Sequence, residues 1–124
     1  LDLAAGSGDS LKIYPSSMSP VGSDFSFSML RVLRAKTAIP LIQAEATELP
    51  FRNGAFAGIT AIGLAEYIST PRKFLSELSR VLNDQGWLAI TISQPNLLNL
   101  LRNFSGNRLR YYSIGTFSQM AAEQ

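Results

Sequence analysis

Short segments rich in apolar residues alternate along the chain with segments in which apolar residues recur at helical spacing. Most of the first kind are apolar throughout, which is typical of strands that are buried on both faces of a parallel sheet. A stripe of the second kind runs from Phe74 through Leu75, Leu78 and Val81 to Leu82, and we expect it to face the core. The pattern predicts an α/β fold with a doubly wound, mostly parallel sheet and helices on both faces. The predicted strands cover residues 1–4, 21–25, 40–46, 57–64 and 87–92.

Capping residues and prolines mark the ends of the predicted helices. Ser26 is a suitable cap for a helix that has Met29 on its apolar face. Thr70 and Pro71, a capping hydroxyl followed by a proline, begin the helix with the apolar stripe, and the polar residues 83–86 end it. The predicted helices cover residues 9–14, 26–36, 71–82, 97–101 and 117–123, the last with Thr116 as its cap.

Composition is that of an ordinary globular protein and excludes several kinds of chemistry. The chain has 124 residues, of which 46% are hydrophobic and 16% charged, and we expect one domain over residues 1–124. The net charge of +2 is too small to predict a nucleic acid partner. The sequence has no run of about 18 apolar residues, so we predict no transmembrane segment. Histidine and cysteine are absent, so we predict no metal site. Any chemistry must then rely on carboxylates, hydroxyls, positioning or a cofactor.

A glycine turn follows the first predicted strand directly. Gly6, Ser7 and Gly8 are followed by Asp9 and not by the lysine of a nucleoside triphosphate loop. Leu11 stands where a dinucleotide fingerprint has its third glycine, so close packing on a pyrophosphate is not supported. Such a turn can admit an amino-acid moiety or the sugar of an adenosine. A plain tight turn between strand and helix is the alternative.

A carboxylate ends the second predicted strand, 18 positions after Gly6. In a doubly wound sheet the carboxyl ends of neighbouring strands meet at the ligand crevice. Asp24 is therefore expected beside the glycine turn, where a carboxylate accepts hydrogen bonds from ribose hydroxyls. The alternative role for Asp24 is to cap the following helix, as Ser26 does.

Four segments in order carry a family resemblance. They are Leu-Asp-Leu-Ala-Ala-Gly-Ser-Gly-Asp at 1–9, the second strand with its acid at 22–30, Glu-Ala-Thr-Glu-Leu-Pro-Phe at 45–51, and Arg-Val-Leu-Asn-Asp-Gln-Gly-Trp-Leu at 80–88. Together they resemble the motifs of class I S-adenosylmethionine (SAM)-dependent methyltransferases with a Rossmann-like fold. The strongest likeness is to the C-methyltransferases of ubiquinone and menaquinone biosynthesis. The resemblance implies that the chain is a fragment, truncated at both ends, and that the last two strands of the sheet lie beyond residue 124.

The resemblance also implies a cofactor and the residues that bind it. SAM would lie against the glycine turn, with its ribose on Asp24, its adenine near Glu45 and Ala46, and the methyl-transfer centre near Ala61 and Gly63. The Leu-Pro-Phe segment at 49–51 belongs to the adenine side in this family, although it could also be only a turn with an anchoring aromatic. The implied cofactor-binding residues are Asp2, Ala4, Gly6, Ser7, Gly8, Asp24, Phe25, Glu45, Ala46, Ala61 and Gly63.

Several positions depart from the family pattern. Ala4 replaces a glycine, Glu45 an aspartate or asparagine, and Ala57 an aspartate, while Ala65 and Glu66 replace an Arg-Asn pair. The last change concerns the methyl acceptor more than the cofactor. Two alternatives therefore stay open: a degenerate SAM-binding domain that serves as a non-catalytic interaction module, and a nicotinamide-dependent domain, which the missing third glycine opposes.

The resemblance implies methyl transfer to a small-molecule acceptor, with a quinol-like ring carbon as one candidate. Ring methylation needs a phenolate or a base, for which Glu66 and Tyr67 are candidates. We expect a cytoplasmic location, with peripheral membrane contact if the acceptor is a lipid quinol. Trp87 is expected to pack in the core, and the basic residues at 102–110 to form a solvated face or an acceptor lid.

Overall fold

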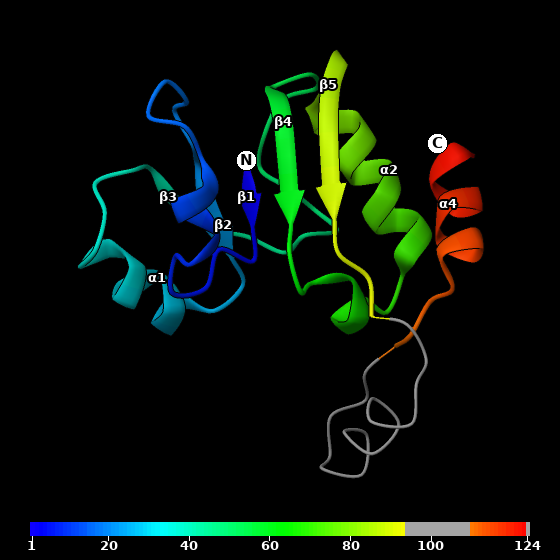
Figure 1. Cartoon of the computed structure of the whole chain (residues 1–124), viewed down its shortest axis with the longest axis horizontal. Coiled ribbons are helices and arrows are strands. Elements are labelled where there is room, and N and C mark those ends of the chain that lie inside the picture. Colours follow the sequence, from blue (N-terminus) through cyan, green and yellow to red (C-terminus); the bar gives the residue numbers. More distant parts are fainter. Residues whose placement is uncertain (94–109, 124) are drawn as a thin grey trace, which may run out of the picture.

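The computed structural model describes residues 1–93 and 110–123, which form one sheet with helices around it (Figure 1). All strand pairs are parallel, and the strand order is β3-β2-β1-β4-β5. The predicted α/β fold with a doubly wound parallel sheet is confirmed. The strands are β1 (Asp2–Leu3), β2 (Gly22–Asp24), β3 (Leu41–Gln43), β4 (Phe56–Ala61) and β5 (Leu82–Ile90).

The helices follow the strands in the predicted order. No helix in this described part of the chain combines the length and the apolar character needed to cross a bilayer. The predicted helix at 97–101 lies outside the described residues. The helical elements are η1 (Ser10–Ile13), α1 (Phe27–Arg34), η2 (Ala65–Tyr67), α2 (Pro71–Val81) and α4 (Ile114–Ala122), where η denotes a 3-10 helix.

The apolar core lies on the α2 face of the sheet. Leu3, Ile59 and Ala61 turn to this face and are at most 2% exposed. The predicted stripe packs against them, and Phe74, Leu75, Leu78 and Val81 are all buried, which confirms their assignment to the core. Burying each of these larger side chains contributes about 1.5–3 kcal/mol to folding.

The opposite face of β1 and β4 is polar. Side chains alternate along a strand, so Asp2 and Thr60 point away from α2, toward η1. The fully buried carboxylate of Asp2 accepts hydrogen bonds from the Ser10 hydroxyl at 2.6 Å and the Thr60 hydroxyl at 2.8 Å. Thr60 in turn is hydrogen-bonded to the Tyr14 hydroxyl. This network fastens the segment after the glycine turn to the centre of the sheet.

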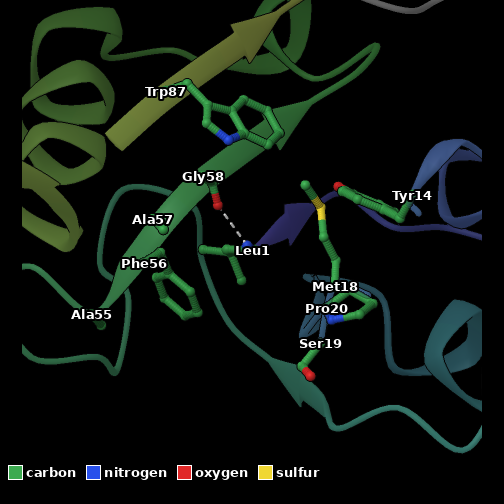
Figure 2. Close-up of a pocket in the computed structure, with 10 residues that line it drawn as sticks. All are labelled: Leu1, Tyr14, Met18, Ser19, Pro20, Ala55, Phe56, Ala57, Gly58 and Trp87. Atoms are coloured by element: carbon green, nitrogen blue, oxygen red, sulfur yellow. Dashed lines mark hydrogen bonds between the residues drawn. The ribbon is translucent and has the colours of Figure 1, made fainter. Parts of the chain in front are cut away.

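Trp87 does not lie in the core, contrary to the prediction. It is 44% exposed and lies on β4 over Gly58, where an added Cβ would come within 2.3 Å of the indole (Figure 2). Together with Leu1, Tyr14 and Met18, it lines a hollow of about 260 Å³ at the amino ends of the strands. The ring stays partly exposed because β5 is the edge strand of the described sheet.

Two further expectations about the helices were wrong. Met29 is 45% exposed, and only Leu30 and Leu33 of α1 are buried. The last helix is capped by Ser113 and not by Thr116, because the Ser113 hydroxyl accepts the hydrogen bond from the Thr116 N–H at 3.1 Å. Thr116 lies inside the first turn and supplies the backbone donor that the cap satisfies.

The polar residues 83–86 follow the end of α2, as predicted, but they belong to β5, which begins at Leu82 and not at Trp87. The pairing of β5 with β4 is irregular there and passes from Phe56–Leu82 to Gly58–Trp87. Within this irregularity the Asn83 side chain accepts a hydrogen bond from the Gln85 N–H at 3.2 Å.

Candidate functional site

The loop after β1, residues 4–8, is held in an unusual backbone conformation; we call it the glycine loop. Three of its residues have positive φ: Ala4 at 55°, Gly6 at 51° and Gly8 at 91°. A Cβ on Gly8 would come within 2.5 Å of Leu33 Cδ1 in α1, so the loop lies directly on that helix. Ala4 adopts the left-handed conformation without being glycine, at a cost of about 1–2 kcal/mol.

The carboxylate of Asp24 reaches the glycine loop from β2. Its Oδ2 accepts the Gly6 N–H at 2.9 Å, and its Oδ1 accepts the Ser26 N–H at 2.8 Å. Ser26 separately caps α1, since its hydroxyl accepts the Met29 N–H. Asp24 therefore supports the helix start and the glycine loop together, and its carboxylate is fixed in orientation by both.

A small crevice of about 90 Å³ opens at the carboxyl ends of β1, β2 and β3 beside Asp24. Five of the predicted cofactor-binding residues line it: Ala4, Asp24, Phe25, Glu45 and Ala46. Four others were not predicted from the sequence, although each is the direct neighbour of a predicted residue. The missed residues are Leu3, Ser23, Ala44 and Leu64.

The remaining predicted residues lie around the crevice and not in its lining. Ser7 and Gly8 border a neighbouring hollow of about 450 Å³ next to α1. Ala61 is fully buried in β4, and the Gly63 N–H donates to the Thr91 hydroxyl at 2.7 Å. The Asp2 carboxylate accepts hydrogen bonds from the Ser10 and Thr60 hydroxyls on the η1 face. Contact of these residues with a cofactor stays a prediction.

The chemistry of the crevice fits a nucleoside. Its walls are mostly apolar and small, and it is bordered by the carboxylate of Asp24 and by Ser23, whose buried hydroxyl has no hydrogen-bond partner among the described residues. A Cβ on Gly6 would meet only the Ala4 carbonyl at 3.8 Å, and one on Gly63 would meet nothing within 4 Å, so both backbones border open space. The described residues contain no cluster of three side chains able to hold a metal. The site suits a sugar and a flat apolar ring better than a metal-bound ligand.

A second carboxylate lies at the same end of the sheet, on the η2 side. Glu66 is only 7% exposed, and its Oε1 accepts the Ser93 hydroxyl at 3.2 Å. Its Oε2 is buried and has no hydrogen-bond partner in the structure described. The backbone carbonyl of Glu66 accepts the Arg110 N–H at 2.8 Å. The other candidate base, Tyr67, is 58% exposed, so the structure distinguishes the two by burial.

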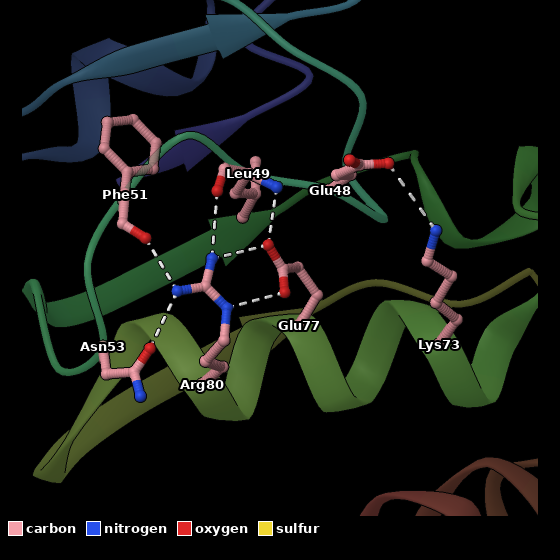
Figure 3. Close-up of polar contacts among 7 residues, drawn as sticks. All are labelled: Glu48, Leu49, Phe51, Asn53, Lys73, Glu77 and Arg80. Atoms are coloured by element: carbon pink, nitrogen blue, oxygen red, sulfur yellow. Dashed lines mark hydrogen bonds and ion pairs between the residues drawn. The ribbon is translucent and has the colours of Figure 1, made fainter.

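An ion pair on α2 fixes the loop that follows the adenine-side residues (Figure 3). The Arg80 guanidinium donates to the carbonyls of Phe51 at 2.7 Å and Leu49 at 2.9 Å and to Glu77 at 2.7 and 2.8 Å. Glu77 also accepts the Leu49 N–H at 2.5 Å. Hydrogen bonds from Arg80 hold the pKa of Glu77 below its ordinary value, and the same pairing raises the pKa of Arg80.

This arrangement bears on the Leu-Pro-Phe segment. The Phe51 ring packs edge-on against Phe56 at 4.7 Å between centroids, and neither ring lines the crevice. Residues 49–51 are anchored to α2 by these hydrogen bonds, and their place on the adenine side of a cofactor stays a prediction. No role for Glu77 and Arg80 in holding this segment was predicted, although their spacing of three on a helix suits an ion pair.

Comparison with known proteins places this geometry in a family. Residues 1–90 match the methyltransferase domain family. The chain belongs to this family. It is 39% identical over 106 residues to a demethylmenaquinone methyltransferase of Paenarthrobacter aurescens, covering 83% of this chain and 42% of that protein. The resemblance to quinone-group methyltransferases is thereby confirmed.

Two further comparisons define how far the likeness extends. A malonyl-[acyl-carrier protein] O-methyltransferase of Legionella pneumophila is 31% identical over 128 residues, covering 97% of this chain and 45% of that protein. The crystal structure of the YcgJ protein of Bacillus subtilis superposes with a TM-score of 0.84 at 23% identity, covering 96% of this chain and 57% of that one, which shows the shared fold. The chain spans less than half the length of the curated relatives that it matches.

Proposed function

We propose that this chain is the core of a cytoplasmic enzyme that transfers a methyl group from SAM to a small-molecule acceptor. The observation that carries the proposal is the contact between Asp24 and Gly6 at the mouth of a small apolar crevice. It joins the carboxylate of β2 to the loop after β1, at the end of the sheet where ligands of doubly wound folds bind. Membership of the methyltransferase domain family supports the same cofactor.

The residues of the crevice take distinct roles in this proposal. Asp24 accepts hydrogen bonds from the ribose hydroxyls, because its oxygens have lone pairs beyond those that the Gly6 and Ser26 N–H groups occupy. Phe25, Ala46 and Leu64 give the adenine apolar surface, and Glu45 accepts from its amino group. Bound SAM supplies a methyl group on a sulfonium sulfur, which is an activated leaving group. The chain then has to align acceptor and donor and exclude water, which can lower a barrier by about 7–11 kcal/mol.

Glu66 is the proposed base on the acceptor side. Its buried Oε2 has no hydrogen-bond partner among the described residues, so that oxygen is available to accept a proton from an acceptor hydroxyl. The Ser93 hydroxyl holds the other oxygen and fixes the carboxylate. We propose a quinol-like ring as the acceptor, since loss of its hydroxyl proton makes the adjacent ring carbon nucleophilic. The identity to a demethylmenaquinone methyltransferase supports this choice of acceptor.

Turnover of labelled SAM by the full-length protein tests the proposal. We expect label to pass from SAM to demethylmenaquinol, and not to a malonyl thioester, which represents the acceptor of the Legionella relative. Calorimetric titration with SAM and with NAD is the companion measurement. Binding of SAM without transfer to any acceptor would favour the non-catalytic module, and binding of NAD in place of SAM would contradict the proposed cofactor.

A further inference from the structure

Helix α1 exposes large apolar side chains to solvent. Phe27 is 62% exposed, Val32 47% and Met29 45%, while only Leu30 and Leu33 of this helix are buried. Phe27 lies on one stripe of the helix with Arg31 and Arg34, whereas Met29 and Val32 lie on the other side of its exposed face. Figure 1 shows α1 at the β3 end of the sheet, at the opposite end from α2 and α4.

The exposed face of α1 carries cations and no acid. Arg31 and Arg34 are exposed there, whereas Lys36, after the helix, donates to the Ser7 carbonyl at 3.1 Å near Asp9. No aspartate or glutamate occurs between residues 25 and 44, although the whole chain carries a net charge of only +2. The nearest acids in sequence are Asp24, which the Gly6 and Ser26 N–H groups hold, and Glu45 at the crevice. The exposed face of α1 is therefore locally cationic, although the net charge of the chain is small.

A groove between α1 and β3 combines both properties. It has a volume of about 290 Å³ and is lined by apolar residues together with two arginines. The Arg34 guanidinium donates to the Ile39 carbonyl at 3.0 Å, which holds its charge at the groove. The residues that line the groove are Phe27, Leu30, Arg31, Arg34, Leu41 and Gln43.

We propose that α1 docks on an anionic lipid bilayer. We call Phe27, Arg31 and Arg34, which share one stripe of the helix beside the groove, the α1 surface. Cations interspersed with aromatic and aliphatic side chains are typical of helices that lie in a membrane interface. Arginine and lysine place their charges among lipid phosphates while their alkyl stems stay on apolar surface. Charge complementarity thus favours an acidic lipid surface over a neutral partner.

Docking by this surface also orients the crevice. Phe25, which lines the crevice and is 72% exposed, lies two residues before α1. A bilayer bound at α1 would lie beside the crevice mouth, where a membrane-dissolved acceptor would enter. The inference goes beyond methyl transfer and does not depend on it, because vesicle binding is measured without SAM or acceptor.

Flotation of the full-length protein with vesicles tests the charge requirement. We expect binding to phosphatidylcholine mixed with phosphatidylglycerol and little binding to phosphatidylcholine alone. Each cation near an anionic bilayer strengthens binding about fivefold, so Arg31→Glu with Arg34→Glu should weaken it at least about 25-fold. The matched control, Arg52→Glu with Lys73→Glu, makes the same change in net charge elsewhere and should weaken it much less. Equal loss in both double variants, or no binding of the unaltered protein, would overturn the proposal.

A second pair of variants tests the apolar requirement. Phe27→Ser should weaken vesicle binding at least about tenfold, since the lost insertion of one aromatic ring removes apolar burial. Ile114→Ser, at an equally exposed apolar residue of α4, should leave it unchanged. Light scattering with the same proteins detects the competing occupant. A dimer of the unaltered protein that Phe27→Ser dissociates would assign the α1 surface to a second copy and overturn the proposal.

Discussion

The carboxylate of Asp24 accepts a hydrogen bond from the backbone N–H of Gly6 at 2.9 Å. These residues are 18 positions apart and come from neighbouring strands. The contact places a fixed negative charge at a loop of left-handed residues that brings backbone close to the crevice. The proposed cofactor site depends on this contact. The conformation of the loop and the role of the carboxylate can each be tested by substitution.

Ala4→Gly should stabilise the protein. Ala4 has a φ of 55°, which costs an L-residue about 1–2 kcal/mol, and glycine removes that cost. The greater freedom of glycine in the unfolded chain offsets about 0.5–1 kcal/mol of the gain. The net increase in the free energy of unfolding, measured by urea titration, should be up to about 1 kcal/mol.

The neighbouring alanine provides the control for that prediction. Ala5 is buried and does not have a positive φ, so Ala5→Gly should destabilise by about 1 kcal/mol. If both variants destabilise equally, the left-handed strain assigned to Ala4 is absent.

Two glycine-to-alanine variants should differ in cost because their surroundings differ. Gly63→Ala introduces only the left-handed penalty of about 1–2 kcal/mol, since its Cβ would meet nothing within 4 Å. Gly8→Ala adds a collision with Leu33 at 2.5 Å, worth about 1–3 kcal/mol more. Thermal unfolding should therefore rank Gly8→Ala as the less stable variant, and the reverse ranking would argue against packing of the glycine loop on α1.

Acid should weaken the hydrogen bonds by which Glu77 and Arg80 hold residues 49–53; we call this arrangement the clamp. Hydrogen bonds from Arg80 lower the pKa of Glu77, so the folded state binds this proton less readily than the unfolded state. The stabilisation is fully present above the ordinary glutamate pKa and is lost as the pH falls through the lowered value. Arg80 stays charged throughout this range because its pKa is raised.

The measurement is the free energy of unfolding between about pH 7 and pH 3. The unaltered protein should lose more stability over this range than Glu77→Gln, which has no carboxylate to protonate. Glu48→Gln is the control, because Glu48 forms only an exposed pair with Lys73 at 3.8 Å. Parallel curves for the unaltered protein and Glu77→Gln would refute the clamp.

Glu66→Gln should lower kcat without changing SAM binding. The amide keeps the shape of the side chain and its contact with Ser93 but cannot accept the proton, and general-base catalysis contributes about 10²–10⁴-fold. Tyr67→Phe should have little effect, because Tyr67 is largely exposed. A Glu66→Gln enzyme with unchanged kcat would leave the base unassigned.

The features that could be predicted from the sequence have a local periodic signal or follow from topology. The α2 stripe from Phe74 to Val81 repeats at helical spacing, and that spacing alone buries it. The approach of Asp24 to Gly6 follows from the convergence of strand ends in a doubly wound sheet. Neither inference requires knowing where distant side chains pack.

The features that were missed depend on long-range placement. Trp87 is apolar and aromatic, but the pattern does not say that its strand lies at the edge of the described sheet. Arg80 binds carbonyls some thirty positions earlier, and no periodic signal joins them. Asp2 was predicted only as a cofactor-binding residue, and its hydrogen bonds with Ser10 and Thr60 depend on how η1 and β4 pack on β1.

Calorimetric titration of SAM into the Asp24→Asn variant of the full-length protein tests the central claim most directly. The amide keeps the size of the side chain but removes the charge, and charged hydrogen bonds are worth about 1.5–3 kcal/mol, so Kd should rise about tenfold or more. Asp84→Asn, at an exposed residue of β5, should bind as the unaltered protein does. Unchanged SAM affinity in folded Asp24→Asn protein would contradict the claim that this carboxylate holds the cofactor.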